Sequence, residues 1–480
     1  MRIAIVGSGI AGLGSALLLS RQGHAVTVFE GEREPGGHSH TVDVTLGGSS
    51  FPVDTGFLVF NDRTYPKLVR LFDELGVDSV PSDMSFSVRN DRAGLEWAGT
   101  NLTTLFAQPR NMLRPAYWRM LRDIVRFNRE ATSLERGGGG FPPMRAARAS
   151  PRGGNAPLGR PGGRVTPPMR AARDSRREGD APRGRPGGRV WSVTLGEYLD
   201  AESYSEAFRD WYLVPMAAAI WSSPARDILD FPLPSFVRFC HNHGLLSIAD
   251  RPQWRTVRGG SRSYVRKIVA NLDDVRLSTR VSAVRRLPRG VEVDTAERRA
   301  ELFDAIVLAC HSDQALALLA DPSAHESRLL AQVRYQPNRV ILHTDTTLLP
   351  RSRRVWSSWN YLTADDPRGD RPVAVSYLIN RLQPLPTSTP VIVTLNPPFE
   401  PDPRAVLEEF EYSHPLLDAG AVAAQRSLER LQGVRHTWYA GAWLGHGFHE
   451  DGLASAHAVA DSVARRVTVT RAPHDDRVAA

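Results

Sequence analysis

A glycine-rich turn near the N-terminus, Gly7–Gly12 with the sequence GSGIAG, constrains the fold of this chain more than any other feature. The apolar run Ile3–Val6 precedes the turn, and helix-forming residues follow it as far as about Gln22. The next apolar run, Ala25–Glu30, ends in an acid. This order of strand, glycine turn, helix and acidic strand end predicts a Rossmann-like α/β domain that binds a dinucleotide.

The residues of the turn have separate roles in such a domain. Gly7 makes the tight turn, Gly9 lets the backbone approach a pyrophosphate, and Gly12 lets the helix pack closely on the strand. The helix N-terminus supplies free N–H groups to the phosphates. Glu30 is placed to accept hydrogen bonds from ribose hydroxyls, and a carboxylate there disfavours the 2′-phosphate of NADP.

Three later segments favour FAD over NAD as the dinucleotide. A second glycine pair, Gly36-Gly37, follows soon after Glu30, and the stretch from Val53 to Val59 contains another glycine at a close backbone approach. Near the C-terminus, Gly441 is followed by the segment 447–453, within which we expect a helix to begin at Asp451 or Gly452. A helix N-terminus aimed at the flavin would stabilise the anionic reduced ring. An NAD-only dehydrogenase, the alternative, has no need for this third segment.

The net charge of +8 is concentrated in one segment. Residues 136–190 hold thirteen arginines and three acids, a balance of +10, so the rest of the chain carries −2. Within that segment Pro142–Val165 recurs as Pro167–Val190, and both copies are rich in Gly, Pro and Arg. Such a composition predicts a disordered insertion in a surface loop. The alternative is an electrostatic tether to anionic phospholipid or nucleic acid, but the folded part is not expected to bind nucleic acid.

The remaining composition is that of an ordinary globular protein. The two cysteines, Cys240 and Cys310, form no CxxC motif, which favours a reducing cytoplasm. No apolar run approaches the length needed to cross a bilayer. Further helices are predicted over 65–75, 263–271, 404–411 and 452–465 and after Thr194, where Glu197 completes a capping box. Further strands are predicted near 275–284, 291–295, 303–309, 391–395 and 438–440.

Several longer motifs resemble one family. They are GGHSHTVDV from Gly36, VDTGFLVFNDRTYP from Val53, PMAAAIWSSP from Pro215, QWRTVRGGSRSYV from Gln253, ACHSDQAL from Ala309, WSSWNYL from Trp356 and GHGFHEDGLASA from Gly445. With these motifs the chain resembles the flavin-containing amine oxidase superfamily. Within it, the chain is similar to a bacterial group of NAD/FAD-binding oxidoreductases associated with cyclopropane-fatty-acyl-phospholipid synthases. The insertion at 136–190 matches no family feature.

The resemblance implies a set of cofactor-binding residues. The pyrophosphate lies along Ser8, Ile10, Ala11 and Gly12, and Glu30 holds the ribose. His38 stands where many members have arginine, which weakens any charged contact with the phosphates. The remaining implied contacts are Gly37, His38 and Ser39 with the phosphate and ribityl chain; Gly56, Phe57 and Leu58 with the isoalloxazine; Val281 with adenine; and Gly441, Glu450, Asp451, Gly452 and Leu453 with the flavin and its ribityl tail.

The resemblance also implies the domain organisation: a Rossmann-like FAD-binding domain of the glutathione-reductase/amine-oxidase type with an interleaved substrate domain. The FAD-binding domain is expected from residues 1–90, 240–312 and 415–467. The substrate domain is expected from residues 91–135, 191–239 and 313–414. Residues 468–480 are expected to form a disordered tail.

No catalytic residue is evident. Phe448 and His449 stand where the superfamily places residues beside the flavin ring, although packing or positioning explains His449 better than acid–base chemistry. Neither Lys67 nor Lys267 matches the lysine that amine oxidases place near flavin N5, which argues against ordinary amine oxidation. The run 310–313 (CHSD) is not expected to be a nucleophilic site, and no metal site is expected.

These features predict an FAD-dependent oxidoreductase that dehydrogenates, desaturates or isomerises an unsaturated or methylated lipid acyl chain. Two alternatives remain open. One is an amine, polyene or isoprenoid oxidoreductase, and the other is a non-catalytic flavoprotein partner of a lipid methyltransferase. A cytoplasmic location, with peripheral contact at the inner membrane surface, accompanies the lipid hypothesis.

Overall fold

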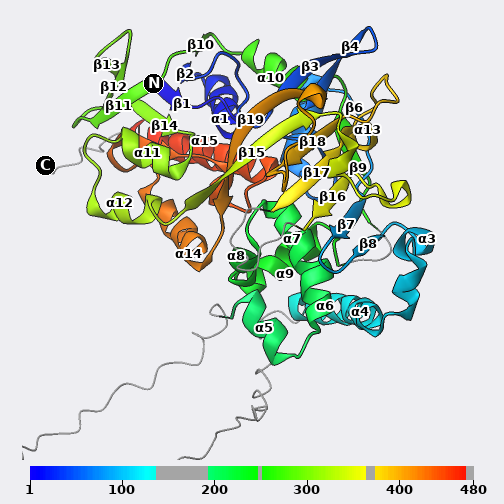
Figure 1. The fold of residues 1–480 in the computed structure, drawn as a ribbon. Coiled ribbons are helices and arrows are strands. Elements are labelled where there is room, and N and C mark those ends of the chain that lie inside the picture. The colour runs from blue at the N-terminus through cyan, green and yellow to red at the C-terminus, as the bar shows by residue number, and fades with distance from the viewer. Residues whose placement is uncertain (137–192, 247–250, 364–372, 472–480) are drawn as a thin grey trace, which may run out of the picture.

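The computed structural model describes residues 1–136, 193–246, 251–363 and 373–471 (Figure 1). The predicted insertion 136–190 lies outside the described residues except for Arg136, which ends a helix. Of the predicted tail, residues 472–480 lie outside them as well, whereas residues up to Arg471 continue the last helix.

A five-stranded parallel sheet forms the centre of the first region. Its strands lie in the order β10-β2-β1-β14-β20, so the N-terminal strand is in the middle. Side chains alternate between the two faces of a strand. Ile3 and Ile5 therefore pack on one face, and Ala4 and Val6 pack on the other. The strands are β1 (Arg2–Val6), β2 (Ala25–Phe29), β10 (Asp274–Arg276), β14 (Ala305–Leu308) and β20 (Thr437–Tyr439).

Helices and a small sheet cover both faces of this parallel sheet. The predicted first helix is α1 (Ile10–Arg21), and it packs with α15 (His449–Arg471) on the Ile3 face. The other face is covered by α11 (Ser312–Leu318), α12 (Ala324–Leu330), α14 (Ala419–Leu428) and an antiparallel sheet of β11 (Val281–Arg286), β12 (Val291–Thr295) and β13 (Glu301–Phe303).

A seven-stranded mixed sheet forms the second region, in the order β19-β15-β18-β17-β16-β7-β8. Most of the helices of this region lie in the lower part of Figure 1. The strands are β7 (Phe86–Asn90), β8 (Leu95–Ala98), β15 (Arg334–His343), β16 (Trp359–Leu362), β17 (Ala374–Leu378), β18 (Ile392–Leu395) and β19 (Val406–Leu416). The helices are α3 (Leu102–Leu105), η1 (Pro109–Leu113), α4 (Pro115–Arg136), α5 (Leu195–Ala201), α6 (Glu206–Phe208), η2 (Arg209–Leu213), α7 (Val214–Trp221), α8 (Ala225–Leu229), α9 (Leu233–Asn242) and α13 (Ile379–Leu382).

Short elements join the two regions. They are β3 (Thr41–Leu46) paired with β4 (Ser49–Asp54), the small sheet β5 (Phe60–Asn61), β9 (Trp254–Val257) and β6 (Ser79–Pro81), and the helices α2 (Pro66–Leu75) and α10 (Arg262–Val269). The predicted helices near 65–75 and 263–271 are thereby confirmed. The capping box of α5 is also present, because Thr194 and Glu197 bond each other's backbone N–H.

The predicted helix over 404–411 is wrong, because residues 404 and 405 end the short 3-10 helix η5 (Pro403–Ala405) and residues from Val406 onward form the long strand β19. Their composition favours a helix locally, but β19 pairs with β15 along ten residues, and Arg339 of β15 forms an ion pair with Glu409 across the strands. Tertiary pairing of this kind overrides local propensity. The stretch 275–284, where strand was predicted, contains parts of two strands in different sheets. Strand β10 joins the parallel sheet, and β11 begins the antiparallel sheet after a turn.

Two other expectations differ from the structure at element ends. Helix α15 begins at His449 rather than at Asp451 or Gly452, because the Asp451 carboxylate accepts the N–H of Phe448 and so caps the helix earlier. Helix α12 and all of α11 after Ser312 fall within the predicted substrate segment 313–414, yet their apolar side chains, such as Ala315 and Leu330, belong to the core of the parallel sheet.

The repeat insertion yields a test that depends on composition alone. Removing residues 137–189 is expected to leave flavin binding unchanged, because the segment offers almost no apolar side chains to a core. Flavin absorbance per mole of purified protein measures this directly. A colourless deletion product beside a yellow full-length chain would contradict the expectation.

Candidate active site

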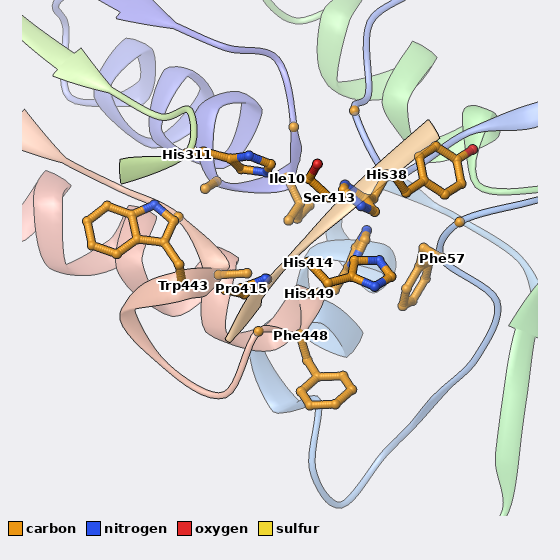
Figure 2. A pocket seen from close by; sticks show the side chains of 18 of the residues that line it. Ile10, His38, Phe57, His311, Ser413, His414, Pro415, Trp443, Phe448 and His449 are labelled. Carbon is orange, nitrogen blue, oxygen red and sulfur yellow. The ribbon is translucent and has the colours of Figure 1, made fainter. Parts of the chain in front are cut away.

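One large cavity, of about 780 Å³, lies where the carboxyl ends of the parallel strands face the second region. Ligands of open α/β sheets bind at these strand ends. Val6 of β1, Phe29 of β2, Ala309 after β14 and Gly441 after β20 all line it. Figure 2 shows the cavity from close by, with side chains from α1, β19 and the start of α15 turned toward it.

The glycine turn forms one wall of the cavity, and its backbone explains the choice of glycine. Gly7 has φ +101°, and a Cβ there would lie 2.8 Å from the Ala309 carbonyl oxygen. A Cβ on Gly12 would lie 1.9 Å from the Gly7 oxygen. At Gly9, by contrast, a Cβ would meet nothing within 4 Å. Gly9 is therefore open on its outer side, and no side chain caps the first N–H groups of α1.

Glu30, the residue after β2, connects the segments of this wall through hydrogen bonds. Its Oε2 accepts hydrogen bonds from the Ser8 N–H, at 2.9 Å, and from the Ser8 hydroxyl, at 2.5 Å. The Ser8 hydroxyl oxygen in turn accepts the Gly36 N–H. A Cβ on Gly37 would lie 3.3 Å from Cα of Gly9, so the two glycine segments lie side by side. This juxtaposition makes a narrow, donor-rich cradle suited to an anion.

A second contact joins the glycine segments to the stretch after β4. A Cβ on Gly56 would lie 2.2 Å from the His38 carbonyl oxygen, and Phe57 donates its N–H to that oxygen at 2.7 Å. Just before them, Oδ1 of buried Asp54 accepts bonds from the Thr41 hydroxyl and from the N–H and hydroxyl of Ser261. Burial raises the pKa of Asp54 to about 6. Asp54 thereby fixes the backbone that presents Phe57 to the cavity.

His449 lies beside Phe57 at the start of α15. The two rings stack with their centroids 3.8 Å apart. Nε2 of His449 is 2.9 Å from the Tyr264 hydroxyl and 3.1 Å from the Ser39 hydroxyl. Burial lowers the pKa of His449 to about 3, so the imidazole is neutral near pH 7. The contacts hold the ring in place and make His449 a positioning group.

Most predicted cofactor-binding residues are brought together around the cavity. Those that line it are Gly7, Ser8, Gly9, Ile10, Ala11, Glu30, Gly37, His38, Gly56, Phe57, Leu58, Val281 and Gly441, together with Phe448 and His449. Their contact with a cofactor stays a prediction, but the shared cavity is what such contact requires.

Six predicted residues lie behind the lining. Gly12 is under the turn, Ser39 is buried against Tyr264, and Gly452 and Leu453 pack on α1. The Glu450 carboxylate accepts the N–H groups of Lys67 and Leu68, both at 3.0 Å, and so caps α2. The Asp451 carboxylate accepts the Phe448 N–H and so caps its own helix, α15. These acids support the site through helix ends and not through the cavity wall.

Other lining residues were not predicted. His414 and Pro415 come from β19, and His311 stacks on Tyr335 with ring centroids 4.2 Å apart. The rings of His38 and His414 are 5.3 Å apart. The helix predicted over 404–411 gave no indication that the following residues of β19 would line the cavity. A strand assignment there, with its alternation of Phe410 and Tyr412, was the signal available in the sequence.

The two lysines lie outside the cavity. Lys267 donates to the Leu75 and Gly76 carbonyls, and Lys67 borders a separate hollow between α1, α2 and α15. Neither lysine is therefore among the residues that line the cavity. Among the described residues, no group of three potential metal ligands is found, and no helix is long and apolar enough to cross a membrane.

Charge is distributed unevenly along the cavity. The charged lining residues are Glu30, Glu32 and Arg280, all at the end near β2 and Val281. The opposite end is lined by apolar and aromatic side chains and two histidines: Met84, Ile220, Trp221, Phe239, His243, Leu245, Trp254, Trp359, Tyr377, Leu395, His446 and Phe448. Burial lowers the pKa of His243 to about 4 and also lowers the pKa of His446, so both rings are neutral near pH 7. The described lining of this second half thus carries no charge.

A dinucleotide cradle that shares one cavity with an aromatic second region is the arrangement of a two-part, dinucleotide-dependent enzyme. Two family models match the chain: an NAD(P)-binding Rossmann-like domain over residues 5–75, and a flavin-containing amine oxidoreductase over residues 218–394. Over these residues the chain is similar to the flavin-containing amine oxidoreductases, in agreement with the resemblance of its motifs. The finer grouping with proteins associated with cyclopropane synthases stays a prediction.

Individual relatives agree with this class. AofH of Mycobacterium tuberculosis, named as a flavin-containing monoamine oxidase, is 37% identical over 98 residues, and the chain spans only 19% of that relative's length. Two solved structures share the fold over nearly the whole chain. A fatty acid isomerase from P. acnes that produces CLA has a TM-score of 0.62 and 16% identity, covering 97% of this chain and 98% of that one. Cyclohexylamine oxidase from Brevibacterium oxydans IH-35A has a TM-score of 0.60 and 18% identity, covering 97% and 99%.

The neutral state of His449 can be observed directly. In protein with isotope-labelled histidine, the ring resonance that disappears in His449→Phe is expected to keep its chemical shift between pH 8 and pH 5.5, because burial places its pKa near 3. Phenylalanine preserves the stack on Phe57, so the variant serves for assignment without removing the packing. A titration of that resonance near pH 6.5 would instead make His449 available for acid–base chemistry.

Proposed function

We propose that the protein is an FAD-dependent oxidoreductase that dehydrogenates, desaturates or isomerises a lipid acyl chain. The observation that carries the substrate class is the uncharged, aromatic half of the cavity. An acyl chain gains free energy by leaving water for such a surface. Burying an ammonium group of an amine substrate without a carboxylate partner would cost free energy.

The residues present fit FAD. The open side of Gly9, the uncapped N-terminus of α1 and the adjoining Gly37 suit the pyrophosphate, and Glu30 suits the adenosine ribose. Val281 lies at the end where adenine would bind, and Phe57, stacked on His449 beside Phe448, lies toward the aromatic half, where the flavin ring would bind. When bound, FAD supplies the two-electron redox chemistry.

The chain's own groups then bind, orient and exclude water. Phe57 is fixed through the Asp54 network, and His449 is fixed on Phe57 by Tyr264 and Ser39, so this wall is rigid before the substrate arrives. Trp221 and Phe239, whose ring centroids are 4.5 Å apart, close the far wall. A dry, preorganised wall of this kind holds the reacting carbon against the cofactor and keeps water from it.

The amine alternative keeps one specific argument: aromatic rings attract cations, and Trp221, Phe239 and Trp254 all line the cavity. The likeness to AofH points the same way. Against it stand the absence of a lysine and of any acid in the described lining of the aromatic half. We therefore rank amine oxidation second.

Anaerobic mixing separates the two. Purified flavin-loaded protein is mixed with linoleic acid, with dioleoyl phosphatidylglycerol dispersions, or with putrescine and cyclohexylamine. Flavin bleaching and the positions of the acyl double bonds are then followed. A lipid response without an amine response supports the proposal, and an amine response alone overturns it. Protein that responds to neither, but on which a lipid methyltransferase depends for activity, would instead be a non-catalytic partner.

A pair of variants localises the response. Met84 lines the aromatic half and lies away from the nucleotide cradle. Met84→Glu is expected to lower lipid turnover at least about tenfold, because a buried carboxylate opposes an acyl chain, whereas Met84→Leu keeps it. Both variants are expected to retain FAD. Equal lipid turnover in Met84→Glu and Met84→Leu would contradict an acyl site at this end of the cavity.

A further inference from the structure

Exposed large apolar side chains are concentrated on one face of the second region. Of the eleven exposed large apolar side chains among the described residues, five fall between residues 102 and 125, on α3, η1 and α4. They are Leu102 (74% exposed), Met112 (49%), Leu113 (86%), Trp118 (51%) and Val125 (57%). These five residues are called the α3–α4 face here. Single exposed apolar residues are normal, but a cluster marks an interaction site.

Contacts connect Trp118 of α4 with η1 and with the end of α3. The Trp118 indole N–H donates to the Met112 carbonyl at 2.8 Å, and its ring lies 5.5 Å from that of Phe106. Phe106 in turn donates its N–H to the Leu102 carbonyl. Val125 lies two helical turns after Trp118 and therefore on the same side of α4.

The opposite side of α4 is in the core. Tyr117, Met120 and Phe127 are buried there against the other helices and β7–β8. The helix thus has a packed inner face and a second, exposed apolar strip that no described part of the chain covers. Its length and amphipathic pattern are compatible with lying on a surface, and its charge excludes crossing a membrane.

Positive charge surrounds the α3–α4 face. Arg110, Arg114, Arg119 and Arg129 lie on or beside these elements, whereas Arg122 pairs with Asp123 and Arg126 pairs with Glu130 and Glu202. The only acid between residues 101 and 129 is Asp123, which is buried and accepts the Ser205 N–H. An apolar surface with cations and without exposed acids is complementary to an anionic lipid surface.

We propose that the α3–α4 face docks the protein on an anionic phospholipid bilayer. Leu102, Leu113 and Trp118 enter the boundary between headgroups and acyl chains, and the arginines contact lipid phosphates. Tryptophan is favoured at that depth, and long basic side chains reach from an apolar stem to the headgroups. The proposal stands on this surface and holds whichever substrate the cavity accepts.

Vesicle flotation of the full chain tests it. With vesicles of phosphatidylcholine containing phosphatidylglycerol, the double variant Leu113→Gln/Trp118→Gln is expected to bind at least about tenfold less than the unaltered chain. Arg119→Gln/Arg129→Gln is expected to lose the preference for these vesicles over pure phosphatidylcholine. Leu302→Gln, on β13 and 54% exposed, is the matched control and is expected to bind normally.

All variants keep the arginine-rich segment 137–189, so a difference between them reports the α3–α4 face alone. Thermal unfolding midpoints equal to that of the unaltered chain show that the variants are folded. Undiminished binding by Leu113→Gln/Trp118→Gln would overturn the proposal. So would a dimer that forms without lipid and disappears in this variant, because the face would then join two copies of the chain.

Discussion

Replacing Gly9 by alanine is expected to leave the protein folded and to weaken FAD binding at least about tenfold, which corresponds to about 1.4 kcal/mol. The φ of Gly9 is −65°, which alanine adopts readily, and the added Cβ would meet nothing within 4 Å. That open space borders the uncapped N-terminus of α1, where we propose that the pyrophosphate binds. The methyl group would therefore displace the ligand and leave the protein undisturbed.

Gly12→Ala provides the contrasting variant. Its Cβ would lie 1.9 Å from the Gly7 carbonyl oxygen, so the turn itself must shift. We expect Gly12→Ala to lower both the thermal midpoint of the flavin-free protein and its flavin content, whereas Gly9→Ala lowers only the latter. Isothermal titration with FAD and thermal unfolding measure the two effects. Unaltered FAD affinity in Gly9→Ala would show that the pyrophosphate binds elsewhere.

A sharp loss of stability between pH 6.5 and pH 5 is the second large effect we expect. Burial lowers the pKa of His243, His343 and His414 to about 4 and that of His449 to about 3. An unfolded histidine binds a proton below about pH 6.5, whereas these buried rings do not. The unfolded state therefore takes up more protons as the pH falls, and each histidine contributes up to about 1.4 kcal/mol per pH unit.

Three acids oppose this trend, because burial raises the pKa of Asp54, Glu450 and Asp451. The pKa of Asp54 is raised to about 6, so below pH 6 the folded state binds a proton that the unfolded state does not bind until its lower, ordinary pKa. For the four histidines and Asp54 together, the net loss is then up to about 4 kcal/mol per pH unit below pH 6. Domains have only about 5–15 kcal/mol of stability, so the chain is expected to unfold at roughly pH 5.

Denaturant midpoints from pH 8 to pH 5 measure the loss. His414→Phe removes one of the four rings and is expected to flatten the slope by about 1.4 kcal/mol per pH unit. Its Nδ1 accepts only a long bond, 3.4 Å, from Asn338, so little else is lost. A midpoint that stays constant from pH 7 to pH 5 would show that these histidines are protonated in the folded protein.

The predictable part of the site was the part encoded by neighbours in the chain. Gly7, Gly9, Gly12 and Glu30 lie within one strand–helix–strand unit, and each has a role that depends on local backbone geometry. The capping box of α5 could likewise be predicted, because its hydrogen bonds join two residues that are near each other in the chain. Such features need no knowledge of distant contacts.

Contacts between distant segments could not be predicted from such local patterns. Residues 404–411 have the composition of a helix, but pairing with β15 makes the residues from Val406 onward a strand that brings His414 and Pro415 into the cavity. The carboxylate of Glu450, whose contact with a cofactor stays a prediction, caps α2, a contact that the sequence did not indicate. In both cases a partner remote in the sequence decides the conformation or contact, and nothing near the residue identifies that partner.

The sequence by itself determined the dinucleotide cradle and the class of protein, because turn geometry and helix ends are local properties of the chain. Only the tertiary structure decided which groups meet at the other end of the cavity. It packed His449 on Phe57, placed both lysines elsewhere and left the aromatic half of the described lining without charge. The chemistry of a cavity depends on side chains gathered from many elements, and folding alone sets their distances.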